Sequence, residues 1–319
     1  MKIITLHHPE ISQAIPKTPI VLALGFFDGV HRGHQAVINR ARREATKREL
    51  PLAVMTFSCS PRIIYQEAHP NSLQYLTTNE EKAQMMADLG VDILYFIEVT
   101  SAFATLSPQE FVDLYMAGFN AQAVVAGFDY TYGKKDVANM ETLPTYSQGR
   151  FDIIRVPKLT SHHEKVGSHF IRQQIKEGQL DLANEALGYP YFFSGVVING
   201  KHRGRELGYP TANVLPDANA VIPKVGVYTV ECVLNHQIYW GMASIGYNIT
   251  FSDQTEKTIE INLFDFNEQI YGEHLKVYWH QYLRDEMKFS SAEALVKQME
   301  QDKKNALDYQ ANYEQDEYR

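Results

Sequence analysis

The feature that most constrains the fold of this chain is a change in its hydrophobic pattern near residue 188. Before about residue 157, short apolar runs alternate with segments of helical pattern. The runs cover residues 20–27, 52–57, 91–99, 121–126 and 151–156. Runs of this length are typical of buried strands. Strands that alternate with helices predict a parallel sheet with helices on both faces and with ligands beyond the carboxyl ends of the strands.

The segments between these runs carry the end signals of helices. Two pairs have capping-box spacing, and two glycines are suitable helix stops: Thr78 with Glu81, Ser107 with Glu110, Gly90 and Gly118. Pro108 stands at the first helical position after Ser107, which strengthens the second box. The first half is therefore predicted to have a Rossmann-like, nucleotide-binding architecture.

Beyond residue 187 the pattern changes to strands. Residues 171–187 have a helical pattern, which residues 188–190 (GYP) then break. The strand-like segments that follow are 195–199, 227–234, 238–245, 258–266 and 274–280, with a short turn at Asn235 and His236. No helix of credible length separates them, so we predict an antiparallel barrel. Ser290 with Glu293 then opens a C-terminal helix that runs to about residue 309.

Length and composition set the remaining limits. A chain of 319 residues exceeds one compact domain, and we expect domains at 1–187 and 188–319. The formal charge of −8 opposes nucleic acid as a partner but allows a small basic pocket. Cys59 and Cys232 stand far apart, so neither a disulfide nor a zinc site is expected. No window reaches the roughly 18 apolar residues of a membrane span, and we expect a cytoplasmic location.

A glycine-rich, basic segment near the start of the second half is the first candidate site. Such a loop can bring backbone N–H groups against phosphate oxygens, although a solvated hairpin has the same composition. The candidate phosphate ligands are Gly200, Lys201, Gly204, Arg205 and Gly208.

Three oxygen-bearing side chains follow this loop. Thr211 and Asn213 are two residues apart and share a face of an extended segment, where both suit Mg²⁺; an ordinary turn uses the same residues. Glu260 points away from its two isoleucine neighbours, as a catalytic base or a surface glutamate would.

Residues 204–213 (GRELGYPTAN) resemble the signature of riboflavin kinases, and the likeness covers nearly the whole second half. It continues through residues 226–228, 258–266, 271–272 and 283–289. The resemblance implies that Thr211 and Asn213 bind Mg-ATP, that Glu260 is the general base, and that Arg284 and Tyr228 contact the flavin. A proline that the family often has within residues 246–251 is absent here.

The second candidate site is the segment 25–34 (GFFDGVHRGH). It follows a predicted strand and precedes a predicted helix, so helix N–H groups would face a bound phosphate there. His31 and His34 share one face of a helical turn, and both could bind the same triphosphate. A metal site or two unrelated surface imidazoles would show the same spacing.

This segment resembles the His-x-x-His motif of bacterial bifunctional riboflavin kinase/FAD synthetases, which join an N-terminal FMN adenylyltransferase to a C-terminal kinase. The likeness continues at residues 124–135. It implies that His31 and His34 act on the phosphates of ATP. The further nucleotide-binding residues that it implies are Gly25, Phe27, Asp28, Gly33, Asp129, Ser168 and Arg172.

Two segments of the first half depart from the family pattern. Relatives commonly read TFDPHPR where residues 56–62 read TFSCSPR, and ISSTxIR where residues 166–172 read VGSHFIR. Three hypotheses follow. The chain converts riboflavin to FMN and FMN to FAD, with ATP and Mg²⁺; or only one half works, the kinase; or both halves bind flavin without turnover, as a regulator.

Overall fold

The computed structural model describes residues 1–9, 15, 17–65, 73–161, 164–200, 208–249 and 255–317. The chain divides into two compact units, Met1–Ser168 and His169–Arg319. The division falls earlier than the border expected at Gly188, because the two helices that precede Gly188 are grouped with the barrel strands. In the described residues, no helix has both the length and the apolar character needed to cross a membrane.

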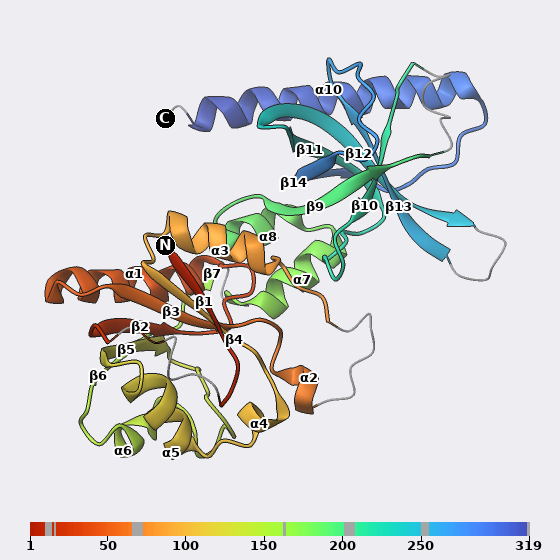
Figure 1. The fold of residues 1–319 in the computed structure, drawn as a ribbon. Helices are drawn as coiled ribbons and strands as arrows, with labels where there is room; N and C mark the ends of the chain where they lie inside the picture. The colour runs from red at the N-terminus through yellow and green to blue at the C-terminus, as the bar shows by residue number, and fades with distance from the viewer. Residues whose placement is uncertain are drawn as a thin grey trace. The chain divides into compact units, whose positions relative to one another are not determined.

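The first unit is built on a parallel sheet of six strands in the order β1-β4-β3-β2-β5-β6 (Figure 1). The strands are β1 (Lys2–Leu6), β2 (Ile20–Leu24), β3 (Leu52–Phe57), β4 (Ile93–Ile97), β5 (Ala121–Gly127) and β6 (Asp152–Val156). All five predicted strands are confirmed. The sequence pattern missed β1, an edge strand whose side chains alternate between exposed and buried, so that it has no continuous apolar run.

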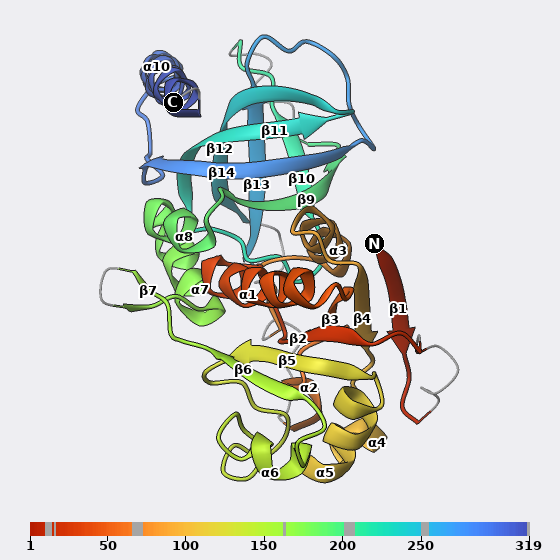
Figure 2. The same cartoon turned by 90° about the vertical axis from the view of Figure 1, so that its left-hand side faces the viewer.

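Helices cover both faces of this sheet, as predicted (Figure 2). Residues of α1 (Arg32–Arg48) and α3 (Asn79–Asp88) belong to the core on one face. The opposite core contains residues of α5 (Pro108–Phe111), the π-helix η2 (Val112–Ala117) and α6 (Leu143–Ser147). The smaller elements are α2 (Arg62–Tyr65), α4 (Ser101–Ala104), β7 (Thr160–Ser161) and β8 (Glu164–Lys165).

The predicted helix ends are confirmed, but the structural reason for glycine at one of them differs from the prediction. Both capping boxes form, at Thr78 and at Ser107. Gly90 has the left-handed φ of 75° that favours glycine as a stop. Gly118 does not, since its φ is −62°; a Cβ there would lie 2.4 Å from the Leu114 carbonyl oxygen. Glycine is therefore needed at 118 for a close backbone approach and not for a left-handed turn.

The second unit contains a closed antiparallel barrel in the order β10-β13-β12-β11-β14-β9, which confirms the predicted architecture. Its strands are β9 (Tyr191–Ile198), β10 (Ala212–Pro216), β11 (Gly226–Leu234), β12 (Gln237–Ile249), β13 (Thr255–Leu263) and β14 (His274–Arg284). Helices α7 (Ser168–Glu177) and α8 (Leu180–Leu187) precede it. Asn235 and His236 form the predicted turn, with φ values of 49° and 66°.

A single long helix, α10 (Ala292–Glu317), follows the last strand and lies along one side of the barrel (Figure 1). The expected cap was Ser290. The structure instead places the Ser291 hydroxyl where it accepts the N–H of Ala294, at 3.2 Å. The cap is therefore one residue later than predicted, because adjacent serines give the sequence pattern no means of choosing between them.

Candidate functional sites

The N-terminal candidate lies where the order of the parallel sheet switches direction. From β2 the chain goes on to β3 on one side, and β5 later pairs with β2 on the other side, with Leu24 opposite Ala126. The segments 25–34 and 127–135 therefore leave the carboxyl ends of neighbouring strands. This switch point is the usual ligand position in such sheets.

The loop that leaves β2 is held in an unusual backbone conformation. Phe27, Gly29 and Val30 have φ values of 53°, 79° and 34°. A positive φ costs a residue other than glycine about 1–3 kcal/mol, and it persists where surrounding contacts enforce it. Gly25 is also required, because a Cβ there would lie 2.7 Å from the ring of Phe27. The loop thus keeps its shape at some cost in stability.

Side chains and backbone groups from distant segments hold this loop. The carboxylate of Asp28, which is 1 % exposed, accepts the N–H of Leu76 at 2.8 Å. Gly29 N–H donates to the hydroxyl of Thr77 at 3.1 Å. The Ser168 hydroxyl donates to the carbonyl oxygen of Asp28 at 2.8 Å. Two predicted nucleotide-binding residues, Asp28 and Ser168, therefore also fix the shape of the loop.

The two histidines stand at the start of α1. His31 is the N-cap, and its Nδ1 accepts the N–H of His34 at 3.3 Å, so a neutral His31 carries its proton on Nε2. The two rings stack 3.5 Å apart, and Phe27 packs edge-on against His34. A Cβ on Gly33 would lie 3.1 Å from the His31 ring. The predicted residues thus form one cluster at a helix N-terminus, where N–H groups favour an anion.

Three further features that the sequence singled out lie on other segments of the chain. Asp129 is exposed just beyond β5, and Arg172 lies on α7 in the second unit, one turn after Ser168. Residues 58–60, which differ from the family pattern, are held mainly through their backbone. The Ser58 N–H donates to the carbonyl oxygen of Ile97, and the Ser60 N–H donates to the hydroxyl of Tyr75. The serines therefore do not prevent this segment from folding.

The second candidate site is a row of polar side chains on one face of the barrel wall. In the strand ladders Glu260 lies opposite Asn213 on β10 and opposite Ser244 on β12. Residues directly opposite each other share a face of the sheet. The neighbours Ile259 and Ile261 are 2 % and 0 % exposed and fill the interior. Glu260 therefore points away from the barrel core, as the alternation predicted.

Thr211, Asn213 and Glu260 come together at this face. The Thr211 hydroxyl donates to Glu260 Oε2 at 3.3 Å. Gly200 permits the approach of Asn213, because a Cβ at 200 would lie 2.1 Å from Asn213 Nδ2. A hydroxyl, a carboxamide and a carboxylate are hard oxygen donors, and this set fits Mg²⁺, which keeps places for water and phosphate.

Not all of the predicted phosphate loop can be placed. Lys201, Gly204 and Arg205 lie outside the described residues. Gly208 is described, exposed and left-handed, with a φ of 79°. The glycine-rich loop as a phosphate site therefore stays a prediction.

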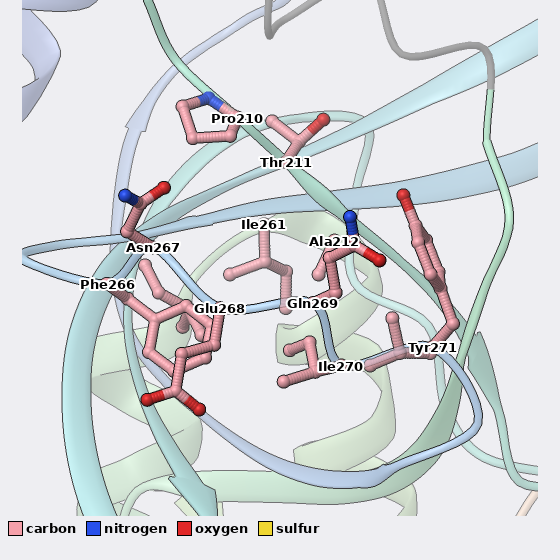
Figure 3. Close-up of a pocket in the computed structure, with 12 residues that line it drawn as sticks. Pro210, Thr211, Ala212, Ile261, Phe266, Asn267, Glu268, Gln269, Ile270 and Tyr271 are labelled. Carbon is pink, nitrogen blue, oxygen red and sulfur yellow. The ribbon is translucent and has the colours of Figure 1, made fainter.

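Two cavities adjoin the polar cluster and share Thr211 as a lining residue. The larger, of about 220 Å³, lies between the strands and α10. Its lining includes Glu260, Val227, Met242, Asn262, Arg284, Leu295, Met299 and Asp302. The smaller, of about 80 Å³, is lined by the segment 266–271 and by Thr211 and Ile261, among others (Figure 3). Two ligands could therefore approach Thr211 from different sides.

An ion pair ties α10 to the last barrel strand beside the larger cavity. Arg284 Nε donates to both carboxylate oxygens of Asp302 at 3.0 Å, and a terminal nitrogen of Arg284 lies 2.7 Å from Oδ2. Asp302 is 2 % exposed and also accepts from Gln298 at 2.9 Å. Sequence patterns missed Asp302 because an aspartate inside a helix usually marks a solvent face.

Tyr228 is placed differently from the other predicted flavin ligand, Arg284. Its side chain is fully buried, its ring packs against Trp279 and Tyr282, and its hydroxyl donates to the carbonyl oxygen of Lys224. This burial raises the pKa of the phenol. Val227, the preceding residue, lines the larger cavity. A direct contact of Tyr228 with flavin stays a prediction.

Comparisons with known proteins match each half of the chain to a family. Residues 14–170 match the family of FAD synthetases, and residues 187–310 match the family of riboflavin kinases. The fold and these two family matches therefore define a two-domain transferase that handles flavin and nucleotide. The chain belongs to the family of bifunctional riboflavin kinase/FMN adenylyltransferases.

The relatives cover nearly the whole chain. The protein of that name from Listeria monocytogenes is 46% identical over 98% of this chain and 100% of its own length. The Bacillus subtilis protein is 41% identical over 98% and 99%. A solved structure from Streptococcus pneumoniae, titled a macrolide-efflux protein, is 39% identical and covers 94% of this chain and 98% of its own, with a TM-score of 0.88.

Proposed function

We propose that this chain makes two flavin cofactors in sequence. The barrel unit transfers the γ-phosphoryl group of ATP to riboflavin and forms FMN. The N-terminal unit then transfers the adenylyl group of ATP to FMN, forming FAD and releasing pyrophosphate. The observation that carries the proposal is the cluster of Thr211, Asn213 and Glu260 beside two cavities: Thr211 lines both cavities, and Glu260 lines the larger.

In the barrel unit, riboflavin is assigned to the larger cavity. Its walls offer Val227, Met242, Leu295 and Met299 to an apolar ring system, and Glu260 lies at the same cavity. The smaller cavity is assigned to ATP. With this arrangement the two substrates meet at Thr211, which lines both cavities. Phosphoryl transfer between bound substrates depends mainly on such positioning.

The chemical step follows from this placement. Glu260 accepts the proton of the ribityl hydroxyl while the hydroxyl oxygen bonds to the γ-phosphorus. The bond from that phosphorus to the β-phosphate oxygen breaks, and ADP is released. Thr211 and Asn213 would hold Mg²⁺, which neutralises charge on the transferring phosphate. Thr211 also donates to Glu260, which orients the carboxylate for its role as base.

In the N-terminal unit no base is needed, because FMN already carries a phosphate nucleophile. Its oxygen attacks the α-phosphorus of ATP, and pyrophosphate leaves. His31, His34 and the first N–H groups of α1 would bind the phosphates and stabilise the developing charge. The stacked, packed histidine pair supports a working site over a vestigial one.

Three remaining expectations complete the proposal. We propose that the functional domains span 1–187 and 188–319, that Mg²⁺ serves both reactions, and that the chain acts in the cytoplasm without nucleic acid or membrane as a partner. Both halves match enzyme families, which favours the two-step reading over a non-catalytic flavin-binding regulator and over a single working kinase half.

The test is a product analysis. The purified chain is incubated with riboflavin, ATP and Mg²⁺, and the flavins are separated by chromatography. We expect FMN first and FAD later, with neither formed when a chelator removes the metal. FMN without FAD would restrict the function to the barrel unit. Unchanged riboflavin would contradict the kinase proposal, and FMN supplied directly would then test the N-terminal unit alone.

A further inference from the structure

A buried lysine lies directly beneath the N-terminal loop. Lys82 stands in the first turns of α3, whose start is fixed by the capping box at Thr78, and it is only 2 % exposed. Its Nζ donates to the carbonyl oxygen of Phe26 at 3.1 Å. The same Nζ lies 4.6 Å from the centre of the Phe26 ring and 6.0 Å from that of Phe96. The sequence motifs did not include this residue.

The carbonyl that Lys82 contacts belongs to the peptide that enters the strained part of the loop. The hydroxyl of Thr56 donates to the same oxygen at 2.8 Å, so this carbonyl has two donors. Immediately after it come the positive φ values of Phe27, Gly29 and Val30. Fixing the Phe26 peptide therefore fixes the point from which the loop turns toward His31.

Stability alone does not account for a lysine here. A buried ammonium group loses its hydration, and one carbonyl and two ring faces replace it only in part. A methionine would fill similar space without that cost. The titratable groups that face Lys82 are Asp28 in the loop and Cys59 after β3, while β4 contributes the apolar ring of Phe96.

The lowered pKa of Lys82 also indicates that its charged form costs stability. Burial lowers the pKa of Lys82 to about 8, against the opposing influence of Asp28 and Cys59. The pKa of an unfolded lysine is roughly 10.4. Between these two values the unfolded chain binds more protons, so the stability contributed by Lys82 rises with pH in that window and is lower when Lys82 is charged. The charged form is thus kept at a cost to folding.

We propose that Lys82 is a positioning residue for adenylyl transfer: its buried ammonium group holds the Phe26 carbonyl and so fixes the loop that presents the α1 N-terminus and His31 to the phosphates. The inference rests on the proposed function of the N-terminal unit. Lys82 acts through the loop and need not touch the nucleotide.

The main test is the variant Lys82→Met, assayed in the full chain. We expect kcat/KM for FAD formation from FMN to fall by roughly ten- to a hundredfold, as small displacements of reacting groups can cause. FMN formation by the same molecules should be unchanged, which shows that the chain is folded. The N-terminal unfolding temperature should stay equal or rise, a result that a merely structural lysine would not give. Lys47→Met, on the exposed face of α1, is the matched control.

Two further measurements keep the test decisive. In the native chain, FAD formation should decline above about pH 8 relative to FMN formation in the same samples, and Lys82→Met should lack that decline. Thr56→Val removes the second donor, and its effect should not add to that of Lys82→Met. Full FAD formation by Lys82→Met would overturn the inference. A loss of activity that is accompanied by a lower N-terminal unfolding temperature would overturn it as well.

The proposed adenylyl transfer and the proposed role of Lys82 can fail independently of each other. A native chain that forms no FAD from FMN would contradict adenylyl transfer in the N-terminal unit. The role of Lys82 would then be decided by the rise in the N-terminal unfolding temperature on adding ATP. We expect Lys82→Met to abolish that rise, and an undiminished rise would overturn the inference.

Discussion

The two candidate sites of this chain position their functional groups in different ways. In the barrel, Asn213, Ser244 and Glu260 are aligned by the hydrogen-bond register of three neighbouring strands. In the N-terminal unit, a loop with three positive φ values is held from outside, by Lys82 and Ser168 among others. The activity of a site aligned by strand register depends on the side chains that face its ligand. The activity of a loop site depends also on side chains that hold the loop and need not touch the ligand.

The largest effect is expected from Glu260→Gln. The change removes the proposed base but keeps the shape of the side chain, so FMN formation should fall by about 10²–10⁴-fold, as loss of general base catalysis predicts. FAD formation from added FMN should be unchanged. Separate assays with riboflavin and with FMN measure both. Unimpaired FMN formation would remove Glu260 from the mechanism.

The corresponding change in the loop site is His31→Ala. It removes both a proposed phosphate ligand and the N-cap of α1, and we expect FAD formation to fall by about a hundredfold with FMN formation intact. The cap alone contributes about 1 kcal/mol.

The variant His31→Asn separates these two contributions. An asparagine can still cap the helix, so its unfolding temperature should match that of the native chain while its activity stays low. Recovery of FAD formation by His31→Asn would show that His31 serves only as a cap.

A smaller effect is expected from Gly200→Ala in the barrel. The new methyl group would meet the Asn213 carboxamide, which must move, and FMN formation should fall by about tenfold with a higher KM for Mg-ATP. Adding Asn213→Ala to Gly200→Ala should cause little further loss, since both changes act on the same proposed metal ligand. Fully additive losses would mean that Gly200 acts elsewhere.

The smallest effect is expected from Ser168→Ala, which removes one of several bonds that hold the loop. Loss of the bond to the Asp28 carbonyl is worth about 1 kcal/mol, so FAD formation should fall about fivefold. Ser147→Ala, which removes a similar bond to Pro144 in the same unit, is the control and should leave activity unchanged. An effect as large as that of His31→Ala would point to direct contact of Ser168 with the nucleotide.

The same contrast explains what the sequence could predict. Buried strands and barrel strands have periodic patterns, so both architectures and the outward direction of Glu260 followed from spacing. Strand β1 was missed because three of its five residues are exposed. Lys82 and Asp302 were missed because charged residues on helices normally face solvent, and only tertiary contacts show that these two are buried. Local motifs locate the loop at 25–34 but not the groups that hold it.

The double exposure of Thr211, to one cavity on each side, has a consequence for inhibitor design. With the substrates assigned to these cavities as proposed above, a compound that joins an isoalloxazine ring to an adenosine polyphosphate would occupy both cavities at once, with its linker passing Thr211. Once one end is bound, the other end meets its cavity at a high effective concentration. The geometry of the barrel wall therefore favours bisubstrate ligands over either half alone.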